Sequence, residues 1–221
     1  MLFTESGNDD EEARILDQAR VGYGAVSRRS RFLVLAGVLI ALAIASVLLF
    51  YKPFPPDHTP EGAYARIAKA VAENHPRDAF AYLEQDAQDA AFSIRDMRKA
   101  AYDVVNRTYP GGTEKEGLLG AYRAEAEAPD GVDVFMLLDA HHGFLGRLRK
   151  DLSGVAGVET VSDRSTVVTA RGTRYSFRRR PNGMWGLTLF SAEMLADSER
   201  AARDLASVRA AAADYTRAKM P

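Results

Sequence analysis

The chain has 221 residues, 47% of them hydrophobic and 27% charged, with a formal net charge of −1 at pH 7, which is typical of a folded protein. From Lys52 to its end it holds 24 basic and 24 acidic residues. This balance argues against nucleic acid as a partner, because nucleic-acid binding calls for an excess of Lys and Arg. The absence of cysteine excludes disulfides, a lipoprotein anchor, a thiol nucleophile and thiolate metal sites.

Residues 1–31 are predicted to be a disordered tail. They contain an acidic stretch from Asn8 to Glu12, and Gly22-Tyr23-Gly24 interrupts a short helical pattern before three arginines. Short charged termini rarely bury enough surface to fold. The alternative interpretation is a docking peptide for a cytoplasmic partner.

An uncharged, apolar run from Phe32 to Tyr51 predicts a transmembrane helix. As a helix it would measure about 30 Å, the thickness of the hydrocarbon core of a bilayer. Arg28, Arg29 and Arg31 precede the run and Lys52 follows it, and the more basic flank stays in the cytoplasm. We therefore expect a single-pass protein of the bacterial inner membrane, with residues 1–31 in the cytoplasm and residues 52–221 in the periplasm.

A cleaved signal peptide is the alternative to this anchor. Ala43-Ile44-Ala45 matches an A-x-A cleavage pattern, and the stretch from Ser27 to Leu33 resembles a twin-arginine export signal. Cleavage would leave a very apolar new N-terminus that begins at Ser46, and the leader would be unusually long. An uncleaved anchor is the favoured interpretation.

Small residues recur on one face of the expected span. Gly37, Ala41 and Ala45 lie four residues apart, and small residues at this spacing let two transmembrane helices approach closely. They predict a weak homodimer through the membrane. The alternative is that these residues reflect only the frequent use of alanine in such helices.

Residues 52–58 are expected to form a Pro-rich spacer, and residues 59–190 a folded exported domain. Thr59-Pro60-Glu61 combines an N-cap hydroxyl, a proline and a carboxylate, as helix starts do. Thr113 and Glu116 have the spacing of a capping box. Apolar periodicity predicts one helix from residue 60 to the break at His75-Pro76 and a second helix that begins near residue 76. It predicts four further helices, over residues 87–106, 113–128, 132–140 and 144–152.

Four short β-rich runs follow the helices, over residues 157–162, 166–171, 173–179 and 185–190. Short turns between them predict an antiparallel meander. Tyr175 and Phe177 alternate with Arg174, Ser176 and Arg178, which indicates one buried face and one solvated face. Helices followed by strands, rather than alternating with them, indicate an α+β fold with several helices on a four-stranded meander.

Residues 191–221 are predicted to form a long, alanine-rich C-terminal helix. Its apolar residues repeat at roughly heptad spacing, and the outer face is charged. This stripe is expected to pack on the protein's own domain, with a second seam for self-association as the alternative. The stripe consists of Leu195, Ala202, Leu205, Ala212 and Tyr215.

No catalytic, cofactor or metal site is predicted. Asp139, His141 and His142 come nearest to a ligand cluster, but adjacent histidines point in different directions and no partner stands at i+4 as a helix-borne zinc site requires. A histidine pair at a helix end is the default interpretation. Arg178-Arg179-Arg180 could hold a phosphate or an anionic lipid headgroup, although a solvated turn is the commoner role of such a run.

A single span followed by helices and a curved antiparallel sheet resembles the NTF2-like (cystatin-like) architecture, over about residues 59–190. The passage from Asp78-Ala79-Phe80-Ala81-Tyr82-Leu83 to Tyr109-Pro110 is also similar to uncharacterised single-pass bacterial envelope proteins. The resemblance implies a small-ligand pocket, an enzyme, or an assembly subunit such as the inner-membrane scaffold of type IV secretion systems. The family usually ends in a strand, whereas this chain continues with a helix after Phe190.

Two functions are compatible with these features. The first is a membrane-anchored periplasmic interaction or scaffold module without catalytic activity, whose partners are the lipid bilayer and envelope proteins. The second is a pocket protein that binds or acts on an apolar small molecule or lipid, with Tyr175, Phe177 and Trp185 as the pocket wall. A filled interface between helices and sheet favours the first, and a deep cavity with inward-facing Asp, His or Arg favours the second.

Overall fold

The computed structural model describes residues 37–43, 45–46 and 54–218. Residues 37–43 and 45–46 are helical, and the chain from Phe54 onward forms a separate compact unit. Within these ranges no helix is both long and apolar enough to cross a membrane. The expected tail (1–31), most of the expected span (32–51) and the first two residues of the spacer lie outside the described residues.

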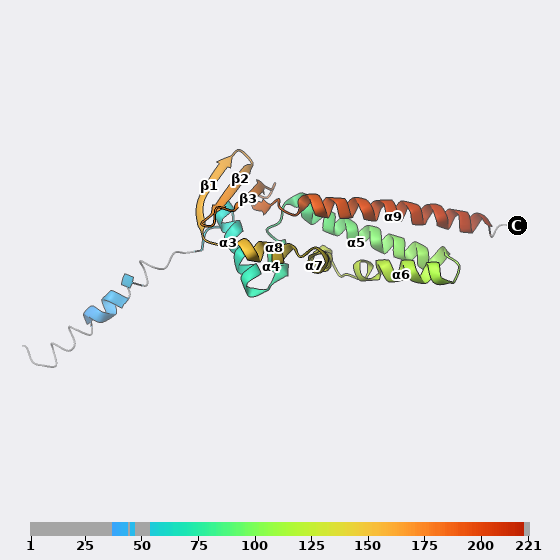
Figure 1. Ribbon diagram of the computed structural model, residues 1–221, viewed down its shortest axis with the longest axis horizontal. Helices are drawn as coiled ribbons and strands as arrows, with labels where there is room; N and C mark the ends of the chain where they lie inside the picture. Colours follow the sequence, from blue (N-terminus) through green and yellow to red (C-terminus); the bar gives the residue numbers. More distant parts are fainter. Residues whose placement is uncertain (1–36, 44, 47–53, 219–221) are drawn as a thin grey trace, which may run out of the picture. The chain divides into compact units, whose positions relative to one another are not determined.

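The unit that begins at Phe54 has the predicted α+β composition, with helices, then a meander, then a long helix (Figure 1). The elements are α3 (Pro60–Glu73), α4 (Pro76–Phe80), α5 (Gln85–Thr108), α6 (Thr113–Ala126), α7 (Gly131–His142), α8 (Phe144–Asp151), β1 (Val155–Val161), β2 (Arg164–Thr169), β3 (Arg174–Arg179), β4 (Trp185–Leu187) and α9 (Ser191–Ala218). The predicted fold class and the long C-terminal helix are confirmed for this unit.

The sheet is a meander in the order β1-β2-β3-β4, with every neighbouring pair antiparallel. The turn between β1 and β2 consists of Ser162 and Asp163, because Val161 pairs directly with Arg164. The sequence placed this turn later, over residues 163–165. Ser162 adopts a positive φ of 58°, and a serine gives little sequence signal for such a conformation.

The last strand is shorter than its sequence pattern suggests. β4 has three residues, and the expected continuation to Phe190 instead leads into the start of α9. The outer edge of β4 is closed by the segment before α5. Glu84 N donates to Leu187 O at 3.0 Å, and Leu187 N donates to Tyr82 O at 2.8 Å.

Helix starts follow the predicted capping chemistry at one site and depart from it at another. Thr59 caps α3, since its hydroxyl accepts from Gly62 N at 3.1 Å. The capping box at Thr113 is wrong: Gly112 is the N-cap of α6, Thr113 is already the first helical residue, and no side chain caps this end. Gly112 has a φ of 145°, which explains why a glycine takes the cap position.

The described part of the spacer, residues 54–58, lies against α3. Arg66 Nη1 donates to Pro55 O at 2.8 Å, and its guanidinium pairs with Asp57 and lies 4.9 Å from the centre of the Phe54 ring. Gly62 makes this approach possible, because a Cβ at that position would overlap the backbone of Pro56.

A first hydrophobic core fills the head of the unit, which consists of α3, α4, α7, α8, the sheet, and the ends of α5 and α9 nearest to it. Phe144 is fully buried and stacks on Phe190 and Phe135, with ring centres at 4.7 Å and 6.0 Å. Burial of one such ring stabilises the fold by about 2–3 kcal/mol. The head therefore has a packed aromatic centre that joins α7, α8 and the start of α9.

Beyond the head, helices α5, α6 and α9 form an arm, which consists of residues 99–126 and 202–218. In Figure 1 α9 runs beside α5, and α6 returns along α5 toward the head. A second core closes the arm, and the α9 stripe contributes Leu205 and Ala212 to it, whereas Leu195 is 43% exposed. The buried members are Ala101, Val105, Tyr109, Tyr122, Leu205, Val208 and Ala212.

Candidate functional site

The three expected pocket-wall residues lie inside the head core. Tyr175, Phe177 and Trp185 are 4%, 1% and 5% exposed. The Tyr175 ring packs against Tyr64 of α3, with ring centres at 5.4 Å. The space between α3 and the sheet is therefore filled at these positions by side chains of the protein itself.

Tyr175 also has an unusual hydroxyl environment. Among the described residues, no group forms a hydrogen bond with its buried oxygen. Burial, with a smaller contribution from nearby Tyr64, raises the pKa of Tyr175 from 10.0 to about 12. A tyrosine with this pKa stays protonated at neutral pH.

The members of the histidine cluster that the sequence singled out have different partners in the structure, although the His141 and His142 rings lie with their centres 4.8 Å apart. Asp139 Oδ1 accepts from Leu145 N at 2.8 Å and so holds the joint between α7 and α8, where Gly143 has a φ of 69°. His142 Nε2 lies 2.7 Å from Asp197 Oδ2 of α9, and His141 is exposed. No group of three or more metal-ligating residues occurs in the part of the chain that the structure describes.

Asp197 is the functional candidate that sequence reasoning missed. It lies 55 residues after His142, is 8% exposed, and also accepts from Arg200 Nη1 at 2.8 Å. In the sequence it is one acidic residue on a helix rich in charge. The packing of both α7 and α9 against α5 brings it to the histidine.

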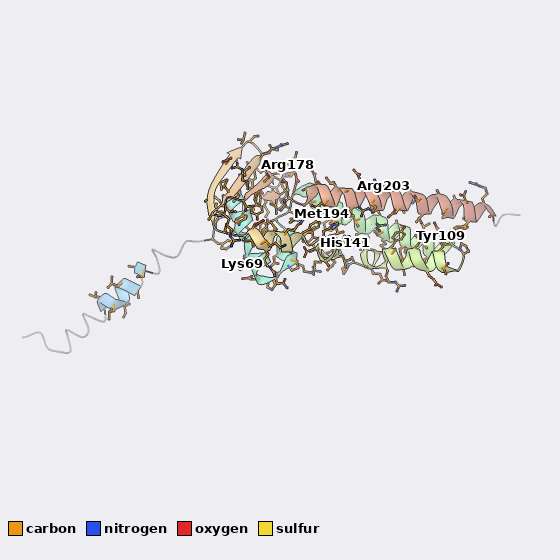
Figure 2. All side chains as sticks on the ribbon, viewed as in Figure 1. Lys69, Tyr109, His141, Arg178, Met194 and Arg203 are labelled. Carbon is orange, nitrogen blue, oxygen red and sulfur yellow. The ribbon has the colours of Figure 1, made fainter. Side chains whose placement is uncertain are left out.

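These residues line a groove of about 220 Å³ where the head meets the arm, which we call the junction groove. Figure 2 shows His141 at this position, between the sheet end of the unit and the far arm where Tyr109 lies. The lining residues are Ile94, Arg98, Glu125, Leu137, Leu138, His141, His142, Asp197 and Arg200.

The charges of the junction groove are held in place by one another. Arg98, whose side chain is 12% exposed, donates to Glu125 Oε2 at 2.8 Å and to Asp204 Oδ2 at 2.6 Å. Its guanidinium also lies 4.8 Å from the centre of the Tyr122 ring. Arg98 therefore joins α5, α6 and α9 at the base of the arm, and the groove has a fixed pattern of positive and negative groups.

The junction groove combines a possible base with paired charges. The His142–Asp197 pair could orient an imidazole as a base, and the lining residues include no Ser, Thr, Cys or Lys. Paired charges beside the exposed Leu137 resemble the polar rim and apolar centre of a protein interface.

The arginine triplet does not form one anion site. Arg178 Nη1 donates to Glu84 Oε1 at 3.0 Å, and it borders an open hollow of about 340 Å³ on the outer face of the sheet. Arg180 turns inward and donates to the carbonyl oxygen of Ala81, at the end of α4, at 2.7 Å. Burial lowers the pKa of the Arg180 guanidinium. Arg179 remains exposed.

The small residues of the expected transmembrane seam fall in the described helical stretches. Gly37, Ala41 and Ala45 are all exposed, and a Cβ added at Gly37 would meet nothing within 4 Å. Their role in self-association stays a prediction.

No protein-family model, curated protein or solved structure matches the chain.

Proposed function

We propose that this chain is a membrane-anchored interaction module of the bacterial envelope, without catalytic activity. One observation carries the proposal: the layer between α3 and the sheet is filled, and the three residues expected to line a ligand pocket are each at least 95% buried there. A filled core leaves the outer surface of the unit as the place where it acts.

The recognition surface in this proposal is the junction groove, with the adjoining face of α7. Arg98 and Asp197 are fixed by ion pairs, so binding there costs little side-chain ordering. Leu137 and Met136 of α7 are 38% and 36% exposed and supply apolar contact area. The partner is an envelope protein that offers an apolar side chain with charged groups around it.

The anchor in this proposal is the apolar run from Phe32 to Tyr51 with its arginine flank. It directs the folded unit to the periplasmic side of the inner membrane. Confinement to a membrane surface raises the effective concentration of the module toward other membrane proteins. The bilayer and an envelope protein are thus both partners in the proposal.

Site-specific photocrosslinking in intact membranes tests this function. A photoreactive residue replaces Leu137 in the groove, and a matched variant carries it at Leu189, which is 49% exposed outside the groove. We expect a discrete crosslinked envelope protein from position 137 alone. The added substitution Arg200→Glu, which reverses one groove charge, should reduce its yield about tenfold, as a loss of about 1.4 kcal/mol would do.

Two results would overturn the proposal. Equal crosslinking from positions 137 and 189, or none from either, would remove the junction groove as a recognition surface. Native mass spectrometry that finds an apolar small molecule or lipid bound in stoichiometric amount would favour the NTF2-like pocket protein instead.

A further inference from the structure

The two edges of the sheet differ. The outer edge of β4 is closed by backbone hydrogen bonds to Tyr82 and Glu84. β1 pairs with β2 on one side, and within the described ranges no backbone hydrogen bond joins its other side to any segment. β1 is therefore an open edge of seven residues.

The β1 edge has few of the features that prevent an exposed edge strand from pairing with another chain. Its sequence, VAGVETV, contains neither lysine nor proline, and its one charged residue is Glu159. A bulge between Val155 and Gly157 distorts one end, and pairing from Gly157 to Val161 is regular. Six of the seven residues are exposed, and Val155 and Val161 are 39% and 77% exposed.

The orientation of the backbone follows from the turn. Pairs in an antiparallel ladder alternate between hydrogen-bonded and non-hydrogen-bonded, and the two-residue turn closes on the pair of Val161 and Arg164. This pair is hydrogen-bonded, so the backbone N–H and C=O groups of Glu159, two residues earlier, also point toward β2. The 3.1 Å hydrogen bond from Ser165 Oγ to the carbonyl oxygen of Glu159 agrees with this direction. Val158 and Thr160 direct their N–H and C=O groups away from β2, toward the open side.

The strand is complementary to itself. In an antiparallel pair of two β1 strands centred on Val158, the regular stretch from Gly157 to Glu159 pairs with its counterpart, and Val161 of each copy lies against the bulged end of the other strand, which holds Val155. Glu159 faces Gly157, so no like charges meet, and Glu159 keeps its ion pair with Arg174 Nη2 at 2.5 Å. A register centred on Glu159 would instead place two carboxylates opposite each other.

We propose that β1 pairs with β1 of a second copy of this chain, antiparallel and centred on Val158, so that two sheets join into one continuous sheet. The two-fold axis is then perpendicular to the sheet, as an isologous interface requires. Val158 already packs at the margin of the head core, and its counterpart extends that core across the interface. The pairing goes beyond the proposed recognition function and does not depend on the membrane anchor.

A single thiol tests the pairing in the full chain. Because the chain has no cysteine, Val158→Cys introduces one reactive site at the axis, and a short bis-maleimide linker is added to membranes that contain the protein. We expect a covalent dimer of the chain from V158C. The matched variant Ser176→Cys places the thiol at an exposed position of β3, two strands from the edge, and should give none.

A second substitution tests the register. Val161→Lys added to V158C replaces a valine contact at the interface by a charge, and it should lower the dimer yield about tenfold. Leu189→Lys makes the same change at an exposed apolar residue away from the edge and should leave the yield unchanged. Gly37→Leu combined with Ala41→Leu, which would block a transmembrane seam, should also leave the yield unchanged.

Each contrary outcome overturns the pairing. Equal dimer yields from V158C and S176C would indicate random collision. A crosslink from position 158 to a different protein would assign the edge to another partner. A yield that does not respond to Val161→Lys, in a variant whose thermal unfolding matches that of V158C, would rule out this register.

Discussion

The carboxylate of Glu84 accepts a hydrogen bond from the hydroxyl of Ser191 at 2.5 Å, although the two residues are 107 positions apart. Glu84 is the N-cap residue of α5, and Ser191 is the first residue of α9. Arg178 of β3 donates to the other carboxylate oxygen of Glu84 at 3.0 Å. This one buried side chain therefore fixes the two long helices of the arm to each other and to the sheet.

Replacement of Glu84 should loosen that connection. We expect Glu84→Ala to lower the free energy of unfolding by about 2 kcal/mol, because it removes a charged hydrogen-bond acceptor and leaves Ser191 without its partner. Glu84→Gln should cost less, since the amide oxygen can still accept from Ser191. Urea unfolding of the detergent-solubilised chain measures both, and equal stability of the two variants would contradict this role.

Gly186 should tolerate no side chain. A Cβ there would lie 2.6 Å from Glu84 Cα and 2.6 Å from Leu83 O, both backbone atoms. Gly186→Ala should therefore destabilise the protein by about 1–3 kcal/mol, as forced overpacking does. Gly120→Ala on α6, where nothing lies within 4 Å, should instead stabilise it by about 0.5–1 kcal/mol. Thermal unfolding of the two variants should thus shift in opposite directions.

The sequence predicted those features that depend on neighbouring residues. Alternation of Tyr175 and Phe177 with polar residues predicted the buried face of β3, and the apolar periodicity of α3 and α5 predicted these helices. The contacts of Glu84 with Ser191 and of His142 with Asp197 could not be predicted in this way, because each joins ordinary polar residues far apart in the chain. The apolar stripe of α9 predicted that this helix packs on the domain, but the contacts depend on which neighbours it meets and in which orientation, and residues close in the sequence do not determine this.

Two buried tyrosines should respond oppositely to loss of their hydroxyl groups. The Tyr175 oxygen has no hydrogen-bond partner among the described residues, so Tyr175→Phe should be neutral or stabilise the protein by up to about 1 kcal/mol. Tyr64 donates to Ser153 O at 2.8 Å and accepts from Ser153 N at 3.2 Å. Tyr64→Phe should cost about 1–2 kcal/mol. Destabilisation of equal size in both variants would show that Tyr175 has a partner.

Stability should fall at alkaline pH, and Tyr175 should contribute to the fall. Burial raises the pKa of Tyr175 from 10.0 to about 12. The folded protein therefore keeps a proton that the unfolded chain releases above pH 10. The contribution is fully present below pH 10 and is lost as the pH rises toward 12. Urea midpoints measured from pH 8 to 11 should decline less steeply in Tyr175→Phe than in the wild type. Identical slopes would contradict the raised pKa.

The apolar segment should remain in the mature protein, and the N-terminus of the protein should lie in the cytoplasm. The expectation depends on the uncharged run from Phe32 to Tyr51 and on the three arginines before it. N-terminal sequencing of the membrane-extracted protein should find residues upstream of Arg28. The thiol of a Ser6→Cys variant should react with a membrane-impermeant maleimide only after the inner membrane is opened. The thiol of a Ser176→Cys variant should already react in spheroplasts. A chain that begins at Ser46 would establish cleavage after Ala45, and the reverse labelling pattern would invert the orientation.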